Sequence, residues 1–113
     1  MDTQVIGLEQ GVTEIRISGR LDGITMPELE QRLEAECFSQ QKLRLIFSLE
    51  KLDYISSAGL RVMLLALKKT TAMKGKLVLY GLNSSVNEIF KLSGFSSIYT
   101  IVSTREEALA MMQ

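Results

Sequence analysis

The sequence predicts an α/β domain with a mixed, mainly parallel five-stranded sheet and about four helices. Two strand-like segments come first and are separated only by a turn, which favours an antiparallel hairpin. Apolar strand-like runs then alternate with segments of helical periodicity, which is typical of parallel strands joined by helices. The 113 residues have 46% hydrophobic content, enough for one core, so we expect residues 1–113 to form a single domain.

Period-two alternation and short apolar runs define the expected strands. Thr13, Ile15 and Ile17 share one face of a strand that follows a turn at Gly11. The run LRLIFSL is apolar almost without interruption, which predicts a central strand covered on both faces. The expected strands are Gln4–Leu8, Thr13–Leu21, Leu43–Leu49, Lys76–Leu82 and Ile98–Val102.

Capping signals and helical periodicity define the expected helices. Capping boxes, in which Ser or Thr is followed three residues later by Glu, begin at Thr25, Ser85 and Thr104. A further helix is expected before Gly75, because that segment contains no helix breaker. The expected helices run from about Met26 to Cys37, from about Ala58 to Met73, from Ser85 to near Gly94, and after Thr104, where Ala108, Leu109 and Met112 can dock on the core.

The topology predicts where a functional site would lie. When helices join parallel strands, the loops that follow the strands meet along one edge, where helix N-termini also point outward. Here those loops are residues 21–25, 49–57, 81–85 and 103–104. If the chain has a site, we expect it along this edge.

Composition and charge argue against several classes of function. Lysine plus arginine and aspartate plus glutamate number 13 each, so no broad basic surface is available for nucleic acid or an anionic membrane. No apolar run approaches the roughly 20 residues that span a bilayer. The single cysteine, Cys37, cannot form an internal disulfide and no secretory signal is recognisable, so we expect a cytoplasmic protein.

Two adjacent serines in LDYISSAGL, residues 52–60, stand between a strand-like run and a helix-like run. The commonest role of such a serine is to cap the helix, and on this pattern alone Ser57 is expected to be the N-cap. The alternative is phosphate chemistry. Gly59 keeps the first helical turn free of side-chain bulk, and the free amides and positive dipole end there favour an added negative charge.

We expect no enzymatic activity, no cofactor and no metal site. The chain contains no histidine and no Gly-x-Ser-x-Gly elbow, which excludes a Ser-His-Asp hydrolase. Neither a Walker A loop nor a Gly-x-Gly-x-x-Gly motif after a strand occurs. A serine–lysine pair stays open as an alternative, although nothing places a lysine near the serines. Cys37 shares the apolar face of the first helix and is expected to be buried.

The segment RLIFSLEKLDYISSAGLRVMLLALKK resembles the signature of the STAS domain family of anti-sigma factor antagonists. That signature is a buried strand, a short loop, a serine before Ser/Ala/Thr-Gly-Leu, and a helix. The segment ISGRLDG, residues 17–23, is similar to the family's Gly-x-Leu-Asp turn. The resemblance extends over essentially the whole chain and implies the minimal, single-domain STAS form.

The resemblance implies a partner-switching function. In that family the unphosphorylated antagonist binds an anti-sigma factor serine kinase, phosphorylation by that kinase ends the interaction, and a PP2C-type phosphatase restores it. Ser57 matches the family's phosphoacceptor, and the preceding position, often aspartate in the family, is Ser56, a less favoured acceptor. The expected partner-binding residues are Asp22, Gly23, Ser56, Ser57 and Gly59.

Two alternatives stay open. Asp22 matches the aspartate of the family's early turn, yet it could equally be an ordinary turn-forming residue. The chain could also be a STAS module that binds a small anion or lipid at the same edge, or a subunit of a larger assembly.

Overall fold

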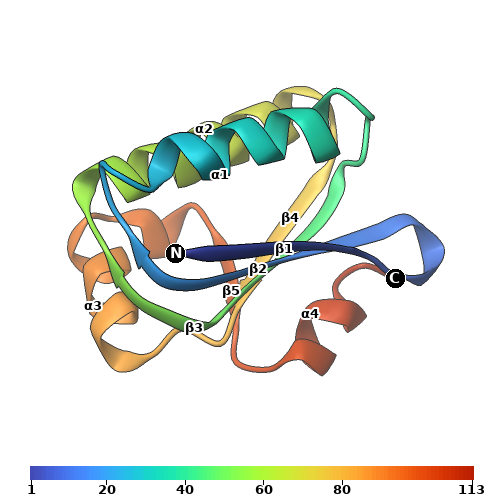
Figure 1. Ribbon diagram of the computed structural model, residues 1–113. Coiled ribbons are helices and arrows are strands. Elements are labelled where there is room, and N and C mark those ends of the chain that lie inside the picture. Colours follow the sequence, from blue (N-terminus) through green and yellow to red (C-terminus); the bar gives the residue numbers. More distant parts are fainter.

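A computed structural model describes all 113 residues and shows one five-stranded sheet (Figure 1). The strands lie in the order β1-β2-β3-β4-β5, so their order in space follows their order in the chain. β1 runs antiparallel to β2, and all other neighbouring pairs are parallel, which confirms the predicted mixed, mainly parallel sheet. The strands are β1 (Asp2–Gly7), β2 (Val12–Leu21), β3 (Arg44–Ile55), β4 (Lys76–Tyr80) and β5 (Thr100–Val102).

Four α-helices cover the sheet unequally, and their number agrees with the prediction. In Figure 1, α1 and α2 lie side by side over one face, α4 lies on the opposite face, and α3 lies near one end of the sheet. The helices are α1 (Met26–Leu33) with its π-helical continuation η2 (Glu34–Phe38), α2 (Ser57–Ala72), α3 (Ser84–Leu92) and α4 (Arg105–Ala110), with 3-10 turns η1 (Glu9–Gly11) and η3 (Phe95–Ser97). No helix combines the length and apolar character that crossing a membrane requires.

The sheet has a hydrophobic core on each face. The larger core, which includes Phe47, is formed mainly with α1 and α2, and the smaller core, which includes Ile46, is formed with α4. β3 therefore sends alternate side chains into both cores, which explains why its sequence is apolar almost without interruption. The terminal helix docks as predicted, with Ala108 and Met112 buried in the smaller core and Leu109 packed against it.

β3 continues to Ile55, although the sequence predicted a strand ending at Leu49 and then a loop. The added part pairs with β2 alone, through two irregularities in register. Each irregularity adds one residue to β3, so the buried side chains of Leu49, Leu52 and Ile55 recur every three residues instead of every two. The prediction failed because these bulges remove the alternation by which a strand is recognised.

Two of the three predicted capping boxes are wrong. Asn83, not Ser85, is the N-cap of α3, and its side chain accepts a backbone N–H of the first turn at 2.8 Å. Thr25 precedes α1 but does not cap it, because its hydroxyl is engaged in the preceding turn, where it donates to the Arg20 carbonyl. Thr104 caps α4 as predicted.

Candidate functional site

The structure brings the loop after β2 and the loop after β3 together at one edge of the sheet. Leu21 and Ile55, the last residues of these parallel strands, are register partners. The backbone N–H of Ser56 then donates to the Leu21 carbonyl at 2.9 Å. Gly23 lies against the start of α2, since a Cβ at this glycine would lie 3.9 Å from the Cβ of Ala58. The structure therefore brings the five expected site residues together at the ends of β2 and β3 and the start of α2, with Gly59 buried beneath the other four.

The two serines differ in what their hydroxyls do. Ser56 is the N-cap of α2, and its hydroxyl oxygen accepts a hydrogen bond from the Gly59 N–H at 3.3 Å. The expectation that Ser57 is the N-cap is therefore wrong, because the helix begins one residue earlier than the sequence suggested. Ser57 is the first residue of the helix, is exposed, and forms no side-chain hydrogen bond within the chain. Of the two serine hydroxyls, only that of Ser57 is without a hydrogen-bond partner in the chain.

Gly59 is buried beneath the serines and allows α2 to approach the end of β2. A Cβ at this position would lie 2.6 Å from the Leu21 carbonyl oxygen and 2.7 Å from a side-chain carbon of Ile55. Real Cβ atoms are almost never found at such distances. A residue without a Cβ is therefore needed at position 59 for α2 to lie this close to the end of β2.

Asp22 has the geometry of the turn-forming alternative. Its Oδ1 accepts hydrogen bonds from the backbone N–H groups of Ile24 at 3.0 Å and Thr25 at 3.1 Å. The Thr25 N–H is the main cause that lowers the pKa of Asp22 below its ordinary value, with the Ile24 N–H and the nearby Arg20 acting in the same direction. Because its carboxylate is engaged within the chain, Asp22 holds the turn between β2 and α1.

Sequence reasoning did not single out three exposed residues near the carboxyl ends of β2 and β3. Ile24, in the Asp22 turn, is 89% exposed. Arg20 and Tyr54 are register partners on β2 and β3, and the guanidinium carbon of Arg20 lies 4.3 Å from the centre of the Tyr54 ring. The available signal was an isoleucine directly after an Asp-Gly pair, where a polar residue is usual.

A second polar cluster, also missed, lies on the sheet face opposite α1 and α2. The carboxylate of Glu14 on β2 is fully buried and accepts from Arg16 at 2.8 Å, Arg105 at 3.0 Å and the Tyr80 hydroxyl at 3.1 Å. Burial alone raises the pKa of Glu14, but the hydrogen bonds from Arg16, Arg105 and Tyr80 outweigh it, so the pKa lies below its ordinary value. The cluster therefore links α4 to two strands of the sheet, β2 and β4.

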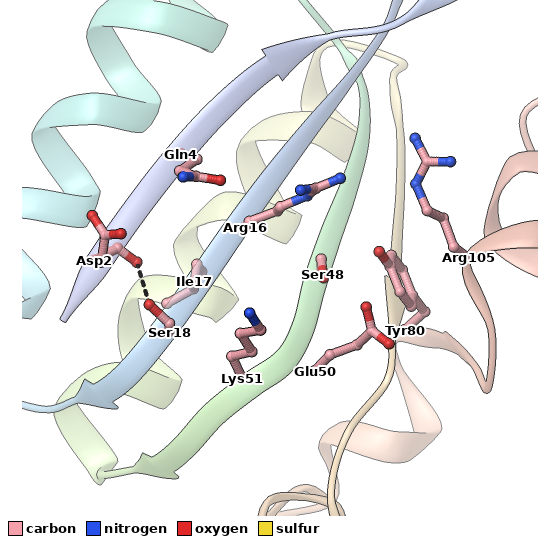
Figure 2. Close-up of a pocket in the computed structure, with 10 residues that line it drawn as sticks. All are labelled: Asp2, Gln4, Arg16, Ile17, Ser18, Ser48, Glu50, Lys51, Tyr80 and Arg105. Atoms are coloured by element: carbon pink, nitrogen blue, oxygen red, sulfur yellow. Dashed lines mark hydrogen bonds between the residues drawn. The ribbon is translucent and has the colours of Figure 1, made fainter.

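A hollow of about 290 Å³ opens beside this cluster (Figure 2). Arg16, Tyr80 and Arg105 reach into the same region from β2, β4 and α4, and Lys51 and Glu50 follow along β3. Three basic side chains line the hollow, Arg16, Lys51 and Arg105, against two acidic ones, Asp2 and Glu50. Arg16 and Arg105 are already paired with Glu14, which indicates a structural role for them.

Cys37 is buried, as predicted. Burial, assisted by the charge of Glu36, raises the pKa of the Cys37 thiol to about 11. The thiolate that reacts with disulfide reagents is therefore scarce at neutral pH. We expect native protein to react with an aromatic disulfide reagent at least about a hundredfold more slowly than protein unfolded in urea, measured by absorbance. Equal rates would show that Cys37 is accessible in the folded state.

Comparison with known proteins identifies the family. Residues 5–108 match the STAS domain family, so the chain belongs to it. BtrV of Bordetella bronchiseptica, named as a candidate anti-sigma factor antagonist, is 43% identical over 93 residues, covering 80% of each chain. The anti-sigma-B factor antagonist of Listeria monocytogenes is 29% identical over 94 residues, covering 83% of this chain and 82% of its own.

Solved structures share the same fold. A candidate anti-sigma factor antagonist of Thermotoga maritima has a TM-score of 0.93 at 18% identity, covering 97% of this chain and 93% of its own. The Bacillus cell-fate determinant SpoIIAA, in its phosphorylated form, has a TM-score of 0.77 at 20% identity. The match covers 99% of this chain and 100% of the SpoIIAA chain. At these identities the likeness concerns the fold alone.

Proposed function

We propose that this chain is an anti-sigma factor antagonist in a partner-switching pathway. It binds an anti-sigma factor serine kinase when unphosphorylated and is released when that kinase phosphorylates Ser57. A PP2C-type phosphatase then returns it to the binding state. The observation that carries the proposal is that Ser57 presents a free, exposed hydroxyl at the start of α2, whereas the neighbouring Ser56 hydroxyl is engaged as the helix cap. The STAS family membership and the names of the relatives agree with this role.

The position of Ser57 explains how phosphorylation can end binding without unfolding the protein. A phosphoserine carries about −1.5 to −2 charge at neutral pH, which is favourable beside the free amides at a helix N-terminus. Arg61, four residues further along α2, is exposed and forms no ion pair, so it can approach the phosphate. A kinase surface docked over Ser57 would instead have to desolvate the dianion, which costs several kcal/mol when no partner charge meets it.

We expect phosphorylation of Ser57 to weaken kinase binding at least about tenfold, which corresponds to about 1.4 kcal/mol or more. The binding partner in this experiment is a serine kinase purified from extracts of the source cell by following phosphorylation of this chain. Its affinity for each form of the chain is measured by calorimetry without ATP. Ser57→Ala should bind like the parent and accept no phosphate. Ser56→Ala is the matched control, and it should still be phosphorylated, with a loss of about 1 kcal/mol in folding stability from the missing cap.

Mass spectrometry of the phosphorylated chain locates the modified serine. Phosphate found only on Ser56, or unchanged affinity after Ser57 is phosphorylated, would contradict the proposal. Thermal unfolding of the two forms separates surface repulsion from unfolding, since our account requires the phosphorylated chain to keep a cooperative transition.

A further inference from the structure

We propose that Ile24 is an apolar contact of the partner kinase and that Asp22 acts as a positioning residue that holds Ile24 in place. This inference rests on the proposed function and names the chemistry by which the partner recognises the unphosphorylated chain. The kinase would offer an apolar pocket beside the site that receives Ser57. Nothing in the fold requires an isoleucine at position 24.

The first observation is the exposure of Ile24. At 89% it is the most exposed of the large hydrophobic side chains, and it contributes nothing to either core. A single exposed apolar residue on a surface is common and by itself needs no explanation. The location distinguishes Ile24, because its turn lies against the first turn of α2, where Ser57 presents its hydroxyl.

The second observation is that the turn carrying Ile24 is held by side-chain hydrogen bonds. Asp22 Oδ1 accepts the N–H of Ile24 itself and the N–H of Thr25, while the Thr25 hydroxyl donates to the Arg20 carbonyl at 2.9 Å. An apolar side chain on a pre-organised turn loses less conformational freedom on binding than one on a mobile loop. The Ile24 side chain is therefore well placed to serve as an anchor.

The third observation is the chemistry of the neighbouring surface. Arg20 belongs to the same turn network as Ile24, and it stacks on Tyr54, which is 37% exposed. Tyrosine and arginine are enriched in protein interfaces and at their energetic centres. Arg20 is thus linked to Tyr54 by stacking and to the Ile24 turn through Asp22, and exposed residues of these types fit contact with a protein partner.

Two possible roles of Asp22, direct contact with the kinase through its charge and support of the turn, predict different responses to substitution. If Asp22 contacted the kinase through its charge, Asp22→Asn and Asp22→Ala would weaken binding equally. If Asp22 holds the turn, Asp22→Asn keeps an oxygen that can accept the two N–H bonds, and binding should be largely retained. Asp22→Ala should weaken binding about fivefold or more, because Ile24 then has to be ordered on binding.

The test is calorimetric titration of each variant, unphosphorylated and without ATP, against the kinase that phosphorylates the parent at Ser57. Ile24→Ser should weaken binding about tenfold or more, because the buried apolar area is lost, and the heat-capacity change of binding should become less negative. Its unfolding midpoint should stay within about 3 °C of the parent. The control is Ile98→Ser, since Ile98 is 52% exposed and precedes β5, at the other side of the sheet from β2.

Each result bears on the inference. Parent-like affinity of Ile24→Ser, an equal loss in Ile98→Ser, or an equal loss in Asp22→Asn and Asp22→Ala would overturn it while leaving the phosphorylation switch intact. A parent chain that neither binds the kinase nor is modified at Ser57 would overturn the proposed function, and this inference with it. If Ile24→Ser loses affinity for the kinase while Ile98→Ser does not, the contact role of Ile24 is supported. If Asp22→Asn keeps the affinity that Asp22→Ala loses, the positioning role of Asp22 is supported.

Discussion

Glu14→Ala is expected to lower the free energy of unfolding by about 3 kcal/mol. The substitution leaves the buried Tyr80 hydroxyl without its acceptor, opens a cavity beside β2, and separates Arg16 and Arg105 from the carboxylate that balances them. The expected loss lies at the lower end of the range of about 3 to 5 kcal/mol for breaking a buried ion pair. The reason is that both arginines are partly exposed and can turn to water. Urea unfolding followed by circular dichroism measures the difference.

One further variant separates charge from shape at this position, and a second serves as a control. Glu14→Gln keeps the size of the side chain and should cost less than Glu14→Ala. Glu88→Ala, at an exposed position on α3, is the matched control and should change stability by less than about 0.5 kcal/mol. A Glu14→Ala protein as stable as the Glu88→Ala control would show that the cluster contributes little to folding.

The same cluster should make stability depend on pH in one direction. The pKa of Glu14 is lower in the folded chain than its ordinary value, so the carboxylate stabilises the fold above the unfolded pKa, about 4.3 for glutamate. That contribution is lost as the pH falls through the lower, folded value. The stability difference between the parent and Glu14→Gln should therefore be largest near about pH 7 and shrink below about pH 4.

Gly59→Ala is expected to destabilise the fold by about 2 to 3 kcal/mol. Alanine favours a helix over glycine by about 1 kcal/mol, so helix propensity alone predicts the opposite sign. The clash dominates because the nearest atom is a backbone carbonyl oxygen at 2.6 Å, which cannot move without shifting the end of β2. The shift would also disturb the bond between the Ser56 N–H and the Leu21 carbonyl.

Gly23→Ala is the matched control at the same site, since the Cβ it adds meets only Ala58 at an ordinary 3.9 Å. Its stability should stay within about 0.5 kcal/mol of the parent, measured by the same urea titration. If Gly59→Ala were as stable as Gly23→Ala, the close approach of α2 to β2 would not be the reason for a glycine at position 59.

The general fold could be predicted because apolar periodicity reports burial directly. Hairpin, alternating strands and helices, and the central position of β3 all followed from local patterns. The placement of the serines just before the second helix followed in the same way, whereas the extension of β3 up to them did not, and their functional assignment depended on family resemblance. The start of α2 after Ser56 could not be predicted from the sequence, because Ser56 and Ser57 are equally good N-cap residues. Only the backbone conformation of the folded chain distinguishes them.

The remaining features depend on contacts between distant parts of the chain. Alternation in β2 put Glu14 on the face opposite Ile15, where an acidic residue is ordinarily solvated. The partners of Glu14, Tyr80 and Arg105, lie 66 and 91 residues further along the chain. No local sequence pattern could therefore predict that Glu14 is buried. The turn role of Asp22 was among the alternatives, and only the positions of the Ile24 and Thr25 N–H groups favoured it.

Because each strand pairs with the strand that precedes it in the chain, the sheet can grow in the order in which a ribosome releases it. β1, β2 and β3 can assemble before β4 and β5 emerge, and α4 is added last. Until α4 docks, Glu14 lacks Arg105 and the smaller core lacks Ala108 and Met112. Docking of α4 thus closes the smaller core, and a chain cut short before Arg105 would expose an apolar sheet face that quality-control proteases and chaperones recognise.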